Sequence, residues 1–304
     1  MPLREAKANF TAMGCPCEIR LVAEDEHLAQ RVLRACHDEA TRFEKKYSRY
    51  RKDSVLSKIN HSAGRSPVTI DPETSALLQY SGACYAQSDG LFDITSGALR
   101  RIWNIDTRTL PRQSEIEDCL KVIGWEKVTL EARTIYLPDA GMELDFGGIV
   151  KEYASDAIAE AARQAGIESG YVNLGGDIAI IGPQSNERPW PVGVSDPSNK
   201  DEPVALIHLR EGAITTSGGY ERYCSIDGRR YSHMINPKTG WPVDSLVSVS
   251  VAAPKAVVAG SLASIALLKG SEGGVEFMES CGVAFFAIDQ FGEYHGHLME
   301  EIYG

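Results

Sequence analysis

The sequence predicts an α+β fold with largely antiparallel sheet. Strand-like and helix-like stretches do not alternate regularly along the 304 residues, as they would in a parallel α/β fold. The pair Asp227-Gly228 separates two short strand-like stretches and is typical of a tight antiparallel hairpin. Because 43% of the residues are hydrophobic and no low-complexity linker divides the chain, we expect one large domain over 1–304, or two intimate α/β halves.

The first elements follow from apolar spacing. Residues 16–23 alternate in polarity like a strand. From Asp25, a good helix N-cap, apolar residues recur every three to four positions as far as Tyr47. This spacing predicts an amphipathic helix whose apolar face belongs to the core.

Three further helix starts carry local signals. Asp71-Pro72 places proline at the first position of a helix that we expect to run to about Ala86. Ser114 with Glu117 matches a capping box. Another helix should follow Gly147-Gly148 and stop before Gly166.

The second half reads mainly as strands. We expect strands within 171–182, 189–194, 204–210 and 246–252, followed by a buried helix of about three turns over 256–268. No Asp or Glu occurs between Ser245 and Ser271, although the chain has 42 acidic residues. This acid-free segment is too short for a membrane span, which needs about 20 apolar residues.

Charge and cysteine content exclude some classes of partner and suggest a compartment. The net charge of −11 argues against nucleic acid or an anionic membrane as the main partner. The seven cysteines are scattered, without paired CxxC spacing, and read as reduced core residues. The first ten residues also lack the apolar core of a secretion signal. We therefore expect a cytoplasmic protein, or a periplasmic one if a leader was removed.

Three glycine-rich stretches could present backbone N–H groups to an anion, and they span 145–153, 173–178 and 215–222. In the first, Lys151 lies in the first turn of a helix, where N–H donors, helix dipole and cation favour phosphate, although a plain turn fits equally well. In the second, Asp177 could hold a ribose hydroxyl or a metal, but such an aspartate is more often a turn residue.

Ser217 and His233 raise two possibilities. A serine nucleophile with a histidine base is conceivable, but the G-x-S-x-G elbow of hydrolases is absent. His233 alone, at a hairpin end beside a proline-containing turn, suits proton transfer near neutral pH. A histidine packed at a strand end explains the same pattern.

Taken together, the chain resembles the ApbE family, the FAD:protein FMN transferases. The resemblance rests on nine segments in register: TAMGCPCEI, YSRYRKDSVLSKIN, SDGLFDITSGAL, ELDFGGIVKEYASD, YVNLGGDIAIIG, PWPVGV, AITTSGGYERY, YSHMINPKTGWPV and the acid-free segment. It implies a T-fold-like architecture and a reaction in which FAD is split at its pyrophosphate. FMN passes to a threonine of a target flavoprotein, and AMP leaves.

The resemblance also implies roles for particular residues. It makes His233 the base that takes the threonine proton, and it makes Lys151 a phosphate contact. The implied flavin or nucleotide contacts are Met13, Tyr50, Leu91, Phe92, Asp93, Asp145 and Lys151. Asp177, which follows the glycine pair of the second stretch, is a further implied contact.

A bound Mg²⁺ is the last implication of the resemblance. Its expected ligands are a main-chain carbonyl near Gly148 and the Asp and Thr of an A-D-x-L-x-T pattern. Here Gly260 and Ser264 stand at those two positions, and Glu152 stands where a small residue is common. Serine can replace threonine, but glycine cannot replace a carboxylate ligand. Two alternatives therefore accompany the transferase: a protein that binds FAD with little or no turnover, and a pyrophosphatase that yields FMN and AMP.

Overall fold

The computed structural model describes residues 4–103, 109–195, 197, 203–220 and 223–298. Within them, eight strands form one sheet in the order β1-β2-β6-β7-β10-β13-β14-β15, and every pairing is antiparallel. The strands are β1 (Arg4–Ala12), β2 (Cys15–Ala23), β6 (Ser169–Leu174), β7 (Asp177–Gly182), β10 (Ala213–Gly218), β13 (Leu246–Ala253), β14 (Ala284–Asp289) and β15 (Tyr294–Gly296). The predicted antiparallel α+β class is confirmed.

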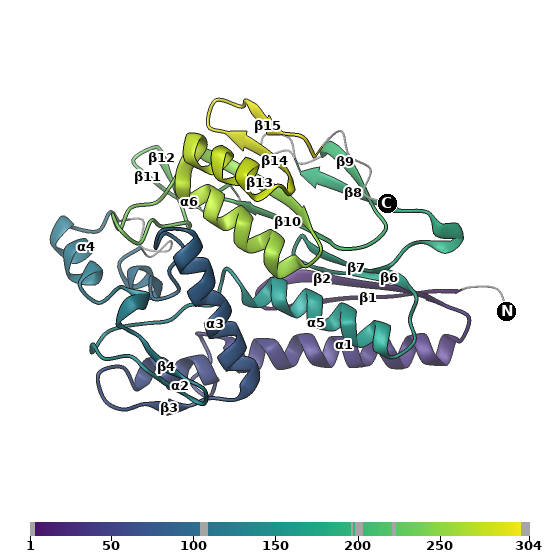
Figure 1. The fold of residues 1–304 in the computed structure, drawn as a ribbon, viewed down its shortest axis with the longest axis horizontal. Coiled ribbons are helices and arrows are strands. Elements are labelled where there is room, and N and C mark those ends of the chain that lie inside the picture. The colour runs from purple at the N-terminus through teal and green to yellow at the C-terminus, as the bar shows by residue number, and fades with distance from the viewer. Residues whose placement is uncertain (1–3, 104–108, 196, 198–202, 221–222, 299–304) are drawn as a thin grey trace.

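One face of this sheet is covered by helices (Figure 1). They are α1 (Glu26–Tyr47), α5 (Val150–Gln164) and α6 (Ala256–Cys281), which pack side by side over the strands. The opposite face packs on the hairpin of β8 (Trp190–Ser195) and β9 (Pro203–Leu209). Successive strand residues point to opposite faces, so Ala179 and Ile181 join the helix-side core whereas Ile180 packs with Trp190.

The segment between α1 and α5 forms a second group of elements beyond the end of the helix layer (Figure 1). It contains α2 (Val55–His61), α3 (Pro72–Gln87), α4 (Gln113–Leu120), the short helical turns η1 (Gly97–Arg101) and η2 (Trp125–Lys127), and a small sheet of β3 (Val68–Thr69), β5 (Thr134–Tyr136) and β4 (Thr129–Glu131).

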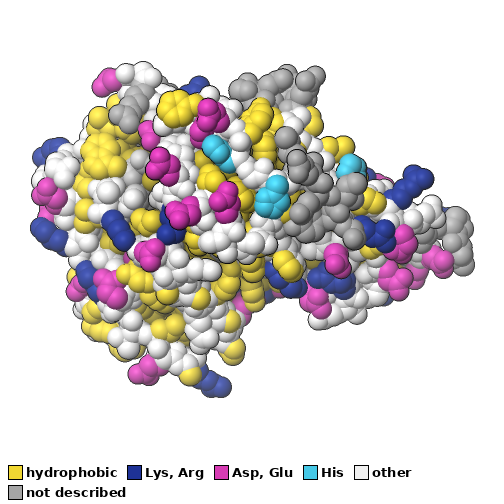
Figure 2. All heavy atoms as spheres, turned by 45° about the horizontal axis from the view of Figure 1, so that its top comes forward, with side chains coloured by type: hydrophobic (Ala, Val, Ile, Leu, Met, Phe, Trp, Pro, Cys, Tyr) yellow, Lys and Arg dark blue, Asp and Glu magenta, His cyan; other side chains and the backbone are white. Residues whose placement is uncertain are grey.

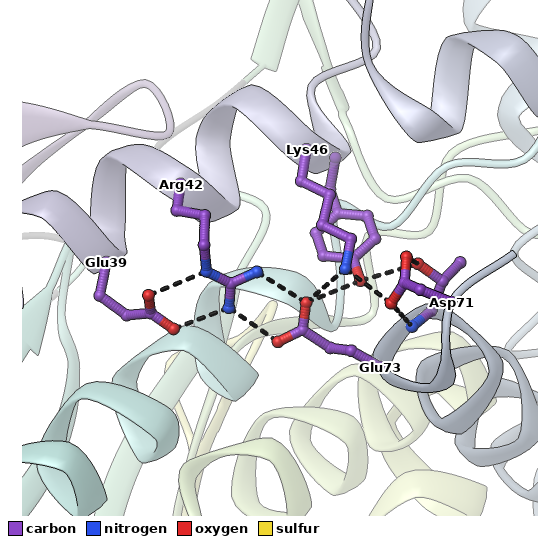
Figure 3. Close-up of polar contacts among 7 residues, drawn as sticks. Glu39, Arg42, Lys46, Asp71 and Glu73 are labelled. Atoms are coloured by element: carbon purple, nitrogen blue, oxygen red, sulfur yellow. Dashed lines mark hydrogen bonds and ion pairs between the residues drawn. The ribbon is translucent and has the colours of Figure 1, made fainter.

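A charged network ties α3 to α1 (Figure 3). Arg42 donates from two nitrogens to Glu73, at 2.8 and 2.7 Å, and also pairs with Glu39. Lys46 Nζ lies 2.8 Å from Asp71 Oδ1 and 2.6 Å from Glu73 Oε2. Bidentate arginine–carboxylate pairs are geometrically specific, and this network anchors the start of α3 to α1.

Most predicted helix starts are confirmed. Asp25 accepts hydrogen bonds from the backbone N–H groups of the first turn of α1, and Asp71 does the same for α3. The predicted capping box at Ser114 is wrong, since α4 begins at Gln113 and Ser114 lies inside it. Glu115 accepts from the backbone N–H of Arg112 at 2.8 Å, and this bond places the N-cap at Arg112, two residues before the predicted one.

Two glycines set backbone turns in the second half. Asp227 and Gly228, both with positive φ, connect β11 (Tyr223–Ile226) to β12 (Arg229–Ser232), as the hairpin prediction required. In α6, Gly270 has φ 83° and ψ −177° and breaks the helix. The predicted helix over 256–268 is therefore the first part of α6. Of the glycine-rich stretch 215–222, residues 221 and 222 lie outside the described residues.

Among the described residues, no helix combines the length and apolarity that crossing a bilayer would require. On the face shown in Figure 2, lysine and arginine side chains are interspersed with aspartate and glutamate.

Candidate functional site

A cavity of about 730 Å³ lies where turns at the ends of the large sheet meet the segment 91–148. Its wall comes from the β1–β2 turn, the β6–β7 turn, the end of β10, the segment after β12, the start of α5 and the middle of α6. All three predicted glycine stretches contribute, through Gly147, Gly148, Gly175, Gly176 and Gly218. Segments far apart in sequence thus converge on one site.

Most of the sequence-predicted site residues line this cavity. They are Leu91, Phe92, Asp93, Asp145, Gly148, Lys151, His233 and Ser264. Met13, Tyr50 and Asp177 are not among the lining residues. Met13 has a φ of 52° and lies in the β1–β2 turn, directly before Gly14, which does line the cavity. Tyr50 is 88% exposed. The structure therefore places Tyr50 on the surface, outside the cavity wall.

Asp177 lies behind the cavity wall and contacts Lys151. The Asp177 side chain is 2% exposed, and its carboxylate forms an ion pair with Lys151 Nζ. Burial alone would lower the pKa of Lys151, but the nearby carboxylates of Asp177 and Glu152 raise it above its ordinary value. Lys151 therefore remains a cation at the cavity wall near neutral pH.

Asp145 holds the loop that leads into α5. Its carboxylate accepts from Arg49 Nη1 at 2.9 Å and from the backbone N–H of Gly147 at 2.8 Å, and it also pairs with Arg100. Although burial opposes it, the two guanidinium groups lower the pKa of Asp145. Arg100, which also lines the cavity, was missed in the sequence because its only signal is its position just after the SDGLFDITSGAL segment.

Asp93 fixes a second loop of the wall. Its Oδ1 accepts from the backbone N–H of Thr95 at 2.8 Å and from Thr95 Oγ1 at 2.7 Å, and its Oδ2 accepts from the backbone N–H of Trp125. Burial raises the pKa of this carboxyl, and these bonds oppose the shift. Asp93 thus keeps Leu91 and Phe92 in place at the cavity.

His233 follows β12 and is half-buried at the cavity. The next residue is anchored, since the backbone N–H of Met234 donates to Ser232 Oγ at 3.0 Å. Across the site, Ser217 Oγ lies 3.2 Å from Ser264 Oγ. A histidine and a pair of hydroxyls therefore border the same space as the Lys151 cation.

The wall also contains two cysteines that composition had assigned to the core. Cys15 and Cys17 are buried free thiols in β2 whose Sγ atoms lie 4.0 Å apart. The hydrogen bond from Cys15 lowers the pKa of Cys17 to about 7. The remaining five cysteines are also free thiols.

Glu152 is the carboxylate that the sequence left without a role. It lies in the first turn of α5, lines the cavity and is 6% exposed. Burial and the neighbouring Asp177 carboxylate raise its pKa to about 8, against the opposing effect of Lys151. Its Oε2 has no hydrogen-bond partner among the described residues. A buried acceptor of this kind is expensive unless a ligand or cation satisfies it.

The sequence model of the ApbE family matches residues 13–287. This chain belongs to the ApbE family. A protein of Klebsiella pneumoniae (strain 342) named FAD:protein FMN transferase is 32% identical over 245 residues, which cover 79% of this chain and 74% of that protein. A protein of Escherichia coli (strain K12) with the same name is 31% identical over 258 residues, covering 81% of this chain and 73% of that protein.

Solved structures agree with this membership. The ApbE protein from Thermotoga maritima superposes with a TM-score of 0.91 at 30% identity, over 98% of this chain and all of that one. The flavin transferase ApbE from Vibrio cholerae superposes with a TM-score of 0.86 at 25% identity, over 97% of both chains. The architecture expected from the family resemblance is therefore confirmed.

Proposed function

We propose that this chain is a FAD:protein FMN transferase, which moves FMN from FAD to a threonine hydroxyl of a target flavoprotein and releases AMP. One observation carries the proposal: a half-buried, charged Lys151, the glycine-rich start of α5 and His233 border a single cavity in an ApbE-family chain. At about 730 Å³, the cavity is of the size that small-molecule and cofactor sites occupy.

The phosphate-binding part of the site is the start of α5. Backbone N–H groups and the positive end of the helix dipole favour an anion there, and Lys151 adds a full charge. These groups would hold the FAD pyrophosphate and stabilise the charge that develops as its P–O–P bond breaks. The apolar Leu91 and Phe92 supply contact area for a ring system of the dinucleotide.

The chemical step needs a base on the acceptor. The threonine Oγ forms a bond to the FMN phosphorus, the bond to the AMP oxygen breaks, and the threonine proton passes to His233. A half-buried histidine between cavity and solvent suits this role, because the target threonine must arrive from outside.

The oxygen groups beside the cavity also fit a divalent cation. Glu152 Oε2 is buried without a hydrogen-bond partner in the described part of the chain, and Ser264 and Gly148 line the same space. Hard oxygen ligands of this type suit Mg²⁺. When bound, Mg²⁺ would neutralise negative charge on the pyrophosphate oxygens.

The test is incubation with FAD, Mg²⁺ and a flavoprotein domain that carries an acceptor threonine. We expect fluorescent labelling of the target and one AMP per label, and neither with a target in which the threonine is replaced by alanine. FMN and AMP without labelled protein would indicate hydrolysis by water instead. Bound FAD that stays intact would refute both reactions and indicate a flavin-binding protein.

A further inference from the structure

Glu152 on α5 and Gly260 on α6 are in direct contact across the helix layer. A Cβ atom placed on Gly260 would lie 2.6 Å from Glu152 Cγ and 3.2 Å from both Cδ and Oε1. Real Cβ atoms essentially never come within 3.0 Å of another atom, so the 2.6 Å approach to Cγ would force a shift. The Glu152 side chain therefore occupies the space that any side chain at position 260 would need.

The Glu152 carboxylate ends at the cavity wall, and one of its two oxygens lacks the partner that a buried carboxylate oxygen needs. Its side chain is 6% exposed, and Oε2 accepts no hydrogen bond from any described residue. The neighbouring cation, Lys151, directs its Nζ to Asp177. A carboxylate in this state is expected to protonate or to bind a cation, because burial of an uncompensated charge is costly.

Other oxygen-bearing groups line the same cavity. Ser264 lies about one helical turn after Gly260 on α6, and its hydroxyl is 3.2 Å from that of Ser217. Gly148 contributes backbone at the start of α5. A carboxylate, hydroxyls and backbone form a set of hard oxygen donors, which selects Mg²⁺ or Mn²⁺ rather than a thiophilic metal.

We propose that Glu152 is the carboxylate ligand of a divalent-cation site that includes Ser264, and that position 260 is glycine to make room for it. The carboxylate thus reaches the site from α5 instead of α6. The inference deepens the proposed function, but metal binding can be measured without turnover.

The test measures Mn²⁺ binding to the full chain by electron paramagnetic resonance, with Mn²⁺ alone and with FAD added. We expect Glu152→Gln to weaken Mn²⁺ binding by about 100-fold or more, because loss of an outer-shell partner alone costs about 10- to 100-fold. The matched control is Glu160→Gln, on the exposed side of the same helix, which should bind Mn²⁺ like the wild type. The exchange variant E152G/G260D, which returns the carboxylate to α6, should regain most of the binding.

Two results would overturn the inference: wild-type Mn²⁺ affinity in folded Glu152→Gln, or no Mn²⁺ binding by the wild type in either condition. If Glu152→Gln does not fold, the exchange variant decides, and its failure to bind Mn²⁺ when folded also overturns the inference. The two proposals fail separately. If Mn²⁺ binding depends on Glu152 but no FMN is transferred, only the proposed function is refuted. If FMN transfer is unchanged without Mn²⁺ and in the Glu152 variant, only the proposed cation site is refuted.

Discussion

Replacement of Gly260 by alanine tests the contact between α5 and α6 independently of any activity. The new methyl group would lie 2.6 Å from Glu152 Cγ, so one of the two helices or the Glu152 side chain must move. Overpacking of a core costs about 1–3 kcal/mol. Alanine gains about 1 kcal/mol over glycine within a helix. We therefore expect Gly260→Ala to lower the free energy of unfolding by about 0–2 kcal/mol.

The same change should have the opposite sign once Glu152 is shortened. In a Glu152→Ala background the clash is gone, and Gly260→Ala should stabilise the protein by up to about 1 kcal/mol. The double-mutant cycle then gives a coupling energy of about 2 kcal/mol between the two positions. Chemical denaturation, with the slope m unchanged among the variants, supplies the four free energies.

Gly273 provides the control, because it lies in the second part of α6 and a Cβ there meets Lys269 Cβ only at 3.7 Å, an ordinary contact. Gly273→Ala should stabilise both backgrounds equally. If Gly260→Ala stabilises the wild type, or costs the same with and without the Glu152 side chain, the steric account of this pair is wrong.

Three further outcomes follow from the site and from the network of Figure 3. His233→Gln should slow FMN transfer about 10²- to 10⁴-fold while FAD affinity, measured by fluorescence titration, stays unchanged; a parallel loss of affinity would contradict its role as a base. Lys151→Met removes the cation that faces buried Asp177, so FAD binding should weaken about 10- to 100-fold and stability should fall by about 3–5 kcal/mol. Stability, but not FAD binding, should recover in K151M/D177N. Although burial opposes the shift, the hydrogen bond from Lys46 lowers the pKa of Asp71 to about 2. The stability that the ionised Asp71 carboxylate contributes is therefore present above the ordinary pKa of an aspartate and is lost as the pH falls toward 2. Asp71→Asn, which keeps a helix-capping acceptor, should be less stable than the wild type at pH 6 by about 1 kcal/mol, discounted for exposure, and thermal melts should show this gap closing by about pH 2.

Local signals gave the parts of the fold that depend on near neighbours in sequence. Asp25 and Asp71 cap their helices because the acceptor and its N–H donors lie within three residues of each other. The prediction of a capping box at Ser114 was wrong for a related reason. The competing bond from the Arg112 N–H to Glu115 is also local, and it places the N-cap of α4 at Arg112, two residues earlier.

The site was predicted in its parts but not in its assembly. Glycine-rich turns and His233 identified the cavity wall, because each carries its own chemical signal. The ion pairs of Arg49 and Arg100 with Asp145 could not be predicted from the sequence, because they join three segments that only the tertiary fold brings together. Tyr50, predicted as a contact from the family resemblance, is 88% exposed and lies outside the cavity wall. The single domain over 1–304 and the cytoplasmic location stay predictions.

The structure connects two departures from the family pattern, Gly260 and Glu152. In the sequence, Gly260 stands where a carboxylate ligand is expected, and Glu152 stands where a small residue is common, with no role assigned to it. In the structure, each explains the other. Glu152 needs the space that only glycine leaves, and the cavity still has a carboxylate. If the pair is compensatory, either reversion alone should be worse than both together. Gly260→Asp would crowd two carboxylates into one buried space, where their mutual repulsion adds to the steric clash.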